Sequence, residues 1–258
     1  MVSKQVRRAL LASQIHRQQN ELELWTTLAA GNFAPRVDFP AGYSPYWEFN
    51  GILYPATSGA AISAPAVGGM QRAVLKGVPL SALTRLDANS TGLVGDITNL
   101  RPDRFRAMQY LYLYLTSVSG DISGWVLPSS MRILYLASTS VRVLATFAGV
   151  GTGMQDFRIY SCSLPAGDVG NIITSIWNAR AGFTYATPSL QIGGNNAAPG
   201  GNVVAPPGDG ASDSDWYWNA GTGKYEPLTA GAMIWDLAKD VNSEDFNKWA
   251  ITYTGGSI

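Results

Sequence analysis

The chain of 258 residues has very few of the side chains that most often perform catalysis or bind metals. It contains one cysteine, Cys162, and one histidine, His16. A single cysteine excludes a disulfide within the chain and a cysteine zinc cluster, and a single histidine leaves little room for histidine-based catalysis. The sequence also shows no Ser-His-Asp, Cys-His or phosphate-loop pattern. We therefore predict a protein that is not an enzyme and has no catalytic residue, metal site or cofactor; a pair of carboxylates acting on a glycan remains the alternative.

Charge and long apolar runs are scarce as well. Only 14% of the residues are charged and the formal net charge is zero, which removes any global electrostatic argument for nucleic-acid binding. No run of 18 apolar residues is present, and the N-terminal sequence becomes polar too soon for a signal-peptide core. Hydrophobic residues make up 46% of the chain, enough for a packed core. We expect a folded protein with no nucleic-acid partner and no membrane insertion.

The most informative feature that is present is a repeat. Five segments begin at Leu83, Met108, Met131, Met154 and Thr187, and the first four starts lie 23 to 25 residues apart. Each segment has mostly apolar residues at its first, fourth, sixth and eleventh positions. The ninth position carries a small or polar residue, namely Thr91, Thr116, Thr139, Cys162 or Asn195. The longer fourth interval contains GDVGNIITSIWNARAG, which predicts an outer helix with Asp168 as its N-cap and Gly182 as its stop.

This pattern, L-x-x-L-x-L-x-x-(N/C/T)-x-L, resembles the leucine-rich repeat family over about 120 residues. The first two segments continue as LVGDI (93–97) and VSGDI (118–122), which is similar to the subtype common in plant receptor ectodomains. We expect Asp96 and Asp121 to satisfy backbone donors in the turns there; catalytic carboxylates are the less favoured alternative. The resemblance implies that each ninth side chain turns inward and bonds backbone between coils, which would make Cys162 a structural residue.

The flanking segments have a different character. Residues 3 to about 30 predict a helix whose seam follows heptad-like spacing, with Leu11, Ile15, Gln18, Leu22, Trp25 and Ala29. Such a helix either packs on its own domain or oligomerises. The predicted fold class is α/β, a short leucine-rich-repeat-like solenoid with a parallel sheet, an N-terminal helix and β-rich caps. Its expected parts are the helix (1–30, anchor or oligomerisation), an N-terminal cap (31–79), the repeats (80–200) and a C-terminal cap or small α+β domain (201–258).

Three segments of the C-terminal part predict secondary structure. DWYWNAGTGKYEPL predicts a hairpin, AGAMIWDLAKDV predicts a short helix, and KWAITYTGG predicts a strand.

The alternation of side chains along a strand predicts which residues point outward from the sheet of repeat strands. If the fourth and sixth positions point into the core, the third, fifth and seventh point outward. These columns hold five of the twelve tyrosines, and Tyr112, Tyr135 and Arg158 form one row. Tyrosine is enriched where proteins bind partners, although aromatic residues also stabilise sheets. We predict a ligand-binding surface made of Tyr110, Tyr112, Tyr114, Tyr135, Arg158 and Tyr160.

The resulting functional hypothesis is a non-enzymatic structural and binding protein. The N-terminal helix and the segment AMIWDLAKDVNSEDFNKWAITYTGG are also similar in general character to repeat proteins of bacteriophage virions. That resemblance implies a virion component, such as a spike, fibre or tail-associated protein. Its partners would be copies of itself or other virion proteins through the N-terminal helix, and a host-surface protein or glycan at the repeat surface. The alternative is a cytoplasmic leucine-rich-repeat scaffold for one protein partner.

Overall fold

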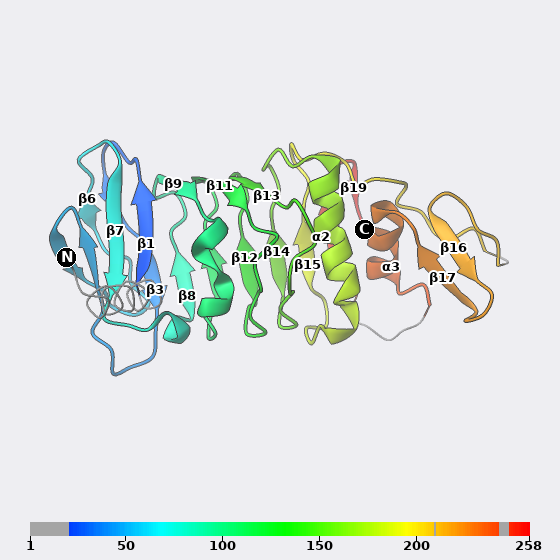
Figure 1. Cartoon of the computed structure of the whole chain (residues 1–258), viewed down its shortest axis with the longest axis horizontal. Helices are drawn as coiled ribbons and strands as arrows, with labels where there is room; N and C mark the ends of the chain where they lie inside the picture. Colours follow the sequence, from blue (N-terminus) through cyan, green and yellow to red (C-terminus); the bar gives the residue numbers. More distant parts are fainter. Residues whose placement is uncertain (1–20, 209, 243–247) are drawn as a thin grey trace, which may run out of the picture.

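The computed structural model describes residues 21–208, 210–242 and 248–258 (Figure 1). The protein is mixed α/β, rich in strands and poor in helices, with a parallel β-solenoid of about three turns at its centre. The molecule is elongated: the solenoid lies between an all-β N-terminal end and a C-terminal end that holds α3, β16 and β17. No helix within the described ranges is long and apolar enough to cross a bilayer.

Each of the first three turns of the solenoid contributes one strand to each of two sheets. The eight-stranded sheet receives a three-residue strand from every predicted repeat, and the seven-stranded sheet receives a second strand from the first three repeats. Neighbouring repeat strands pair in parallel and in register, so that Tyr112 lies beside Tyr135, and Tyr135 beside Arg158. The strands of the first kind are β8 (Arg85–Asp87), β10 (Tyr110–Tyr112), β12 (Ile133–Tyr135), β14 (Asp156–Arg158) and β15 (Ser189–Gln191). Those of the second kind are β9 (Leu93–Asp96), β11 (Ser117–Asp121) and β13 (Ser140–Arg142).

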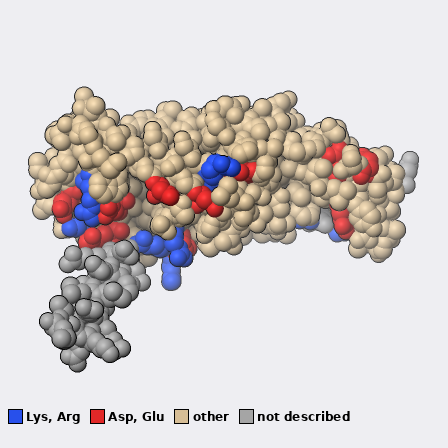
Figure 2. Space-filling model, turned by 45° about the horizontal axis from the view of Figure 1, so that its top comes forward, with Lys and Arg blue, Asp and Glu red and all other residues tan. Residues whose placement is uncertain are grey.

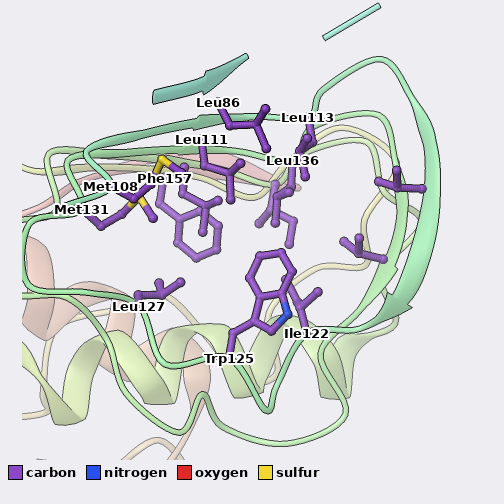
Figure 3. Close-up of a cluster of buried hydrophobic side chains, with 14 of the residues drawn as sticks. Leu86, Met108, Leu111, Leu113, Ile122, Trp125, Leu127, Met131, Leu136 and Phe157 are labelled. Atoms are coloured by element: carbon purple, nitrogen blue, oxygen red, sulfur yellow. The ribbon is translucent and has the colours of Figure 1, made fainter. Parts of the chain in front are cut away.

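The core fills the inside of the coils. Every repeat strand of the eight-stranded sheet has a buried central residue between two half-buried ones, as the predicted register requires. Figure 3 shows Leu86, Leu111 and Trp125 pointing into the enclosed space from different sides of the coil. The Trp125 side chain is fully buried, and its Nε1 donates to the carbonyl oxygen of Thr98 at 3.2 Å, so its one polar atom is satisfied.

The prediction of an N-terminal helix is wrong for its last part, residues 21–30. Residues Leu22–Thr26 form strand β1, with Leu22, Leu24 and Thr26 buried and the residues between them exposed. Trp25, which the heptad placed on a buried seam, is 38% exposed. A strand forms because β1 fits between two partners, pairing antiparallel with β7 (Gln71–Lys76) on one side and with β9 on the other. The rest of the predicted helix, residues 3–20, lies outside the described residues.

The strands before the first repeat extend both sheets. Strand β3 (Arg36–Asp38) pairs antiparallel with β8 and continues the eight-stranded sheet. Beyond β1 and β7, the seven-stranded sheet continues through the hairpin of β4 (Tyr46–Phe49) and β5 (Ile52–Pro55). These strands shield the apolar end of the first coil, the role expected of a solenoid cap. A two-stranded pair of β2 (Asn32–Phe33) and β6 (Ala64–Pro65) completes this end.

The predicted outer helix is present, but its boundaries differ from the prediction. Helix α2 spans Ala166–Asn178 and its N-cap position is Pro165, so Asp168 lies in the first turn. The buried carboxylate of Asp168 accepts from Nε of Arg142 at 2.6 Å and from the backbone nitrogen of Val143 at 2.9 Å. Asp168 therefore joins the helix to the preceding coil instead of capping it. The helix ends at Asn178, and Gly182 instead closes the short 3-10 helix Arg180–Gly182 that follows.

The C-terminal elements agree with the sequence expectation. Strands β16 (Trp216–Asn219) and β17 (Lys224–Pro227) form the predicted antiparallel hairpin, and helix α3 (Ala230–Lys239) follows. Strand β18 (Ala250–Tyr253) pairs in parallel with β15 and so extends the solenoid sheet, while β19 (Gly256–Ser257) forms its edge. Trp216 is fully buried in this part of the protein.

The predicted inward position of the ninth repeat residue is confirmed in four repeats and is wrong in the fifth. Thr91, Thr116 and Thr139 are buried, but they donate to backbone carbonyl oxygens three residues earlier, within their own coil and not between coils as predicted. Cys162 is also buried. In the fifth repeat Asn195 is exposed and Asn196 turns inward. The start of that repeat is likewise displaced by one residue, because Thr187 is exposed and Pro188 is buried.

Candidate functional site

The outward side of the eight-stranded sheet carries all six residues of the predicted binding surface. Their side chains are half-buried, as they would be on an open face where each is supported only by its neighbours. Among the described residues, the repeat strands contact neighbouring strands of the sheet, and no helix packs over this face. Parallel sheets are usually covered on both sides, which makes this face unusual. We call it the tyrosine face.

Aromatic contacts connect four of the tyrosines. Tyr112 and Tyr135 are neighbours across β10 and β12, with ring centroids 5.0 Å apart and the planes nearly perpendicular. Tyr114 lies against Tyr135 at 6.2 Å, and Tyr110 lies parallel to Tyr112 at 6.5 Å. The outward columns predicted from strand alternation are therefore in contact, and they form one continuous aromatic cluster.

Asp156 organises the centre of the tyrosine face. Its Oδ2 accepts from the Tyr135 hydroxyl at 2.5 Å and from Nη2 of Arg158 at 2.7 Å, and its Oδ1 accepts from the Ser189 hydroxyl at 2.9 Å. The Arg158 guanidinium also lies 4.3 Å from the centre of the Tyr135 ring, within cation–π distance. These contacts fix the orientation of the Tyr135 and Arg158 side chains.

A second arginine fixes the other side of the aromatic cluster. The Arg85 guanidinium lies 4.6 Å from the centre of the Tyr112 ring and donates to Asp87 at 2.7 Å. One strand further along, Arg36 pairs with Asp38 at 3.2 Å. The strands of this sheet thus carry three Arg–Asp pairs whose charges cancel, so the tyrosine face presents aromatic and polar atoms without a net charge of either sign.

The hydroxyl protons of two central tyrosines are retained at high pH. Burial first, and then the hydrogen bond to Asp156, hold the pKa of Tyr135 far above its ordinary value of 10.0. Burial also raises the pKa of Tyr112. Both rings therefore stay neutral throughout the physiological range, and the Tyr135 hydroxyl remains a donor.

This shift predicts a pH effect on stability. An unfolded tyrosine ionises near pH 10, whereas folded Tyr135 keeps its proton, so its contribution to stability is present below pH 10 and is lost as the pH rises toward the folded pKa. We expect the unfolding free energy of the wild type to fall more steeply above pH 10 than that of Tyr135→Phe. Urea unfolding at pH 8 to 11, with tyrosinate absorbance recorded in parallel, measures this; identical slopes in both proteins would contradict it.

The alternative catalytic candidates have structural roles. Asp96 accepts from the backbone nitrogen of Thr98 at 2.7 Å, and Asp121 from that of Ser123 at 2.9 Å, as predicted for turn residues. Burial is the main cause that raises the pKa of the Cys162 thiol, which donates to the carbonyl oxygen of Leu136 at 3.1 Å. Figure 2 shows sparse charged groups: red and blue atoms lie together at the left end of the molecule, whereas the right end shows mainly red atoms.

Sequence reasoning missed the residues that position the tyrosines. Asp156, Arg85 and Asp87 belong to the same outward columns, but they are absent from the predicted site. The signal that could have found them is their spacing: an arginine and an aspartate two residues apart in a strand lie on the same face and can pair. Tyr160, which was predicted, lies two residues beyond Arg158 and is half-buried. The hydrogen bond to Asp156 is the main cause that raises the pKa of the Arg158 guanidinium, and Tyr160 makes only a minor contribution. Comparisons with protein-family models, curated proteins and solved structures found no match to this chain.

Proposed function

We propose that this chain is a non-enzymatic binding protein and that the tyrosine face is its binding surface. The observation that supports this proposal most strongly is a parallel sheet that no described element covers, with a preorganised aromatic cluster around Tyr112 and Tyr135. Rigid tyrosines provide large contact area at a small entropic cost, which is why they are enriched at binding sites. The contacts of Asp156 and Arg85 have already fixed these side chains in the free protein.

We further propose that the solenoid is of the leucine-rich repeat type. The proposal is supported by the short in-register strands, by the inward threonines at the ninth position, and by the second strands β9 and β11, which hold the first four residues of the L-x-G-x-I-like segments. In that type of repeat, loops and helices occupy the opposite side of the coil from the short strands. Helix α2 takes such a place here (Figure 3).

The shape and chemistry of the face favour a protein partner over a glycan. Arg85 lies over the Tyr112 ring and Arg158 over the Tyr135 ring, so fewer ring faces are free to stack on sugars. The eight strands, at about 4.8 Å spacing, make a surface about 34 Å long, a dimension suited to a protein interface. Because the three Arg–Asp pairs leave the tyrosine face without net charge, we expect a partner whose contact surface is also close to neutral.

The biological setting is a separate prediction. We propose a virion component that contacts a host-surface molecule, with a cellular scaffold as the alternative; both rest on sequence resemblance. The proposed assembly role of the N-terminal segment belongs to the same prediction and concerns residues outside the described ranges.

Site-specific photo-crosslinking tests the binding proposal and captures the partner in the same experiment. Benzoylphenylalanine replaces Tyr112, Tyr135 or, as a control, Trp25, an exposed aromatic residue on the other sheet. After irradiation in an extract of the native source, we expect the same protein to be attached at positions 112 and 135 and not at position 25. Equal labelling at all three positions, or none at 112 and 135, would count against a protein-binding tyrosine face. In the latter case an array of neutral oligosaccharides tests the glycan alternative.

A further inference from the structure

The N-terminal end of the solenoid has an unprotected sheet edge. Strand β5 is the last strand of the seven-stranded sheet and pairs only with β4 among the described strands. Its first two residues, Ile52 and Leu53, are 57% and 58% exposed. Soluble proteins usually protect such an edge with charged side chains, a bulge or a covering segment. Here the edge is apolar and bare within the described part of the chain.

The absence of charge extends well beyond β5. No charged residue occurs from Phe49 to Gln71, a continuous stretch of 23 residues in a chain that has 36 charged residues in total. The same stretch contains Val67 and Met70, which are 75% and 69% exposed. Large exposed apolar groups gathered at one end of a molecule are typical of a contact surface.

The hairpin that precedes β5 determines which backbone groups face outward. Asn50 and Gly51 both have positive φ, 51° and 77°, as a tight two-residue hairpin turn requires, and Phe49 pairs with Ile52. Hydrogen bonding alternates along an antiparallel pair, so Ile52 and Tyr54 bond to β4. The N–H and C=O of Leu53 therefore point away from the sheet and are free to accept another strand.

A shallow apolar pocket adjoins this edge. It has a volume of about 600 Å³, and its lining includes Leu53 and Pro55 of β5 together with Phe39, Tyr43 and Tyr46. Tyr43 is itself 40% exposed. A strand added to β5 would therefore lie beside an apolar surface that its side chains could cover, which adds burial to the backbone hydrogen bonds.

We propose that β5 pairs antiparallel with β5 of a second copy of this chain around a two-fold axis at Leu53. In this arrangement the two Leu53 residues exchange N–H to carbonyl hydrogen bonds, and the Gly51 N–H of each copy donates to the Pro55 carbonyl of the other. The two seven-stranded sheets become one continuous sheet. This interface is distinct from the tyrosine face, and it does not depend on the function proposed for that face.

A second copy fits this edge better than an unrelated strand for two reasons. The five residues Gly51–Pro55 are centred on Leu53, and Pro55, which has no N–H, limits pairing to this short symmetric stretch. The stretch from residue 49 to 71 carries no charge, and Glu48, which faces Leu53 from β4, is paired with Lys76 at 2.8 Å, so two identical edges meet with little like-charge repulsion. A two-fold interface requires this kind of self-complementarity.

The mass of the full-length protein in solution tests the proposal. We expect the wild type to sediment as a concentration-dependent dimer or even-numbered assembly. Leu53→Lys should weaken the association by about 10-fold or more, because it places two ammonium groups opposite each other. The matched control is Leu144→Lys, since Leu144 is 59% exposed but lies outside β5. A monomeric wild type at all concentrations would overturn the proposal, as would association that both variants leave unchanged.

Engineered cysteines test the register. Facing residues of a hydrogen-bonded antiparallel pair have Cα atoms about 5.5 Å apart, within the range that a disulfide spans. The only native cysteine, Cys162, is buried. Leu53→Cys should therefore form a covalent dimer under mild oxidation. Ile52→Cys should not, because residue 52 faces residue 54 of the other copy. Equal crosslinking of both variants, or none for Leu53→Cys, would contradict two-fold pairing at Leu53.

Discussion

Replacing Asn196 with alanine is expected to lower the unfolding free energy by about 3 kcal/mol. The buried amide makes four hydrogen bonds, three of which reach the fourth coil while one lies within the fifth. Its Oδ1 accepts from the backbone nitrogens of Cys162 at 2.9 Å and Leu164 at 3.1 Å. Its Nδ2 donates to the carbonyl oxygens of Ile159 at 2.7 Å and Ile192 at 2.9 Å. Alanine leaves all four backbone groups without this partner, and the residue is only 2% exposed, so water cannot easily replace it.

The neighbouring asparagine provides a matched control. Asn195 is exposed and bonds only to Ser163, through the backbone nitrogen at 2.9 Å and the hydroxyl at 3.0 Å. We expect Asn195→Ala to cost about 0.5 kcal/mol, as is typical of a surface hydrogen bond that water can replace. Equilibrium urea unfolding of the two variants gives both values. Equal losses would show that the inward position of the fifth repeat has been assigned to the wrong residue.

The asparagine pair illustrates how far the sequence predicts the fold. The strand register follows from apolar spacing, because a shift by one residue in a strand would move every core side chain to the solvent side. After strand β15 of the fifth repeat, the chain turns through Gly194 at a positive φ. The repeat pattern in the sequence does not determine which of the two adjacent asparagines, Asn195 or Asn196, then faces inward. Asn196 faces inward because its side-chain amide can hydrogen-bond to buried backbone N–H and C=O groups of both coils, and the positions of these groups are known only from the structure.

The N-terminal prediction failed for a different reason. The burial of Leu22–Thr26 alternates as in a strand, but the apolar Trp25 at an exposed position conceals this alternation in the sequence, and the good helix formers before the segment favour a helix. Its actual conformation depends on strands far along the chain. The buried Thr26 hydroxyl donates to the carbonyl oxygen of Thr91 at 2.7 Å, a contact between residues 65 positions apart. Tertiary pairing of this kind overrides local helix propensity.

For the candidate site, sequence reasoning placed the tyrosines on one face but could not predict their supports. Alternation alone gathers Tyr110, Tyr112 and Tyr135 on one side of the sheet. Whether Asp156 bonds to Arg158, to Tyr135 or to both depends on rotamers and on the distance between strands. The observed contacts to both residues are what make the cluster rigid, and rigidity is central to the proposed binding role.

Removing two ring systems from the tyrosine face is expected to abolish most partner affinity while the fold survives. Tyr112→Ala combined with Tyr135→Ala deletes the perpendicular pair at the centre of the cluster. A central aromatic residue of an interface commonly contributes about 2 kcal/mol or more, so the loss of one such contribution alone would lower the affinity by about 30-fold, and we take this as the minimum for the double variant. Both rings are half-buried and lie outside the core, so the loss of stability should be modest, about 1 kcal/mol for each ring.

A tyrosine elsewhere separates a local effect from a general loss of aromatic surface. Tyr217 on the C-terminal hairpin is 47% exposed and lies outside the tyrosine face. Tyr217→Ala should therefore leave partner affinity within about two-fold of the wild type, since exposed residues outside an interface contribute little to binding. If Tyr217→Ala lowered the partner affinity as much as the double variant does, the interface would include the C-terminal hairpin, and the assignment to the tyrosine face would be contradicted.

The central claim, that the tyrosine face binds a partner, is tested most directly by titrating the partner captured at position 112 into the double variant. Calorimetry gives the affinity, and thermal unfolding of the same samples gives the stability. The account predicts an affinity reduced by at least about 30-fold in a variant that still unfolds cooperatively. Unchanged affinity, or a variant that no longer folds, would contradict it, because the tyrosines would then be either uninvolved in binding or required only for the sheet.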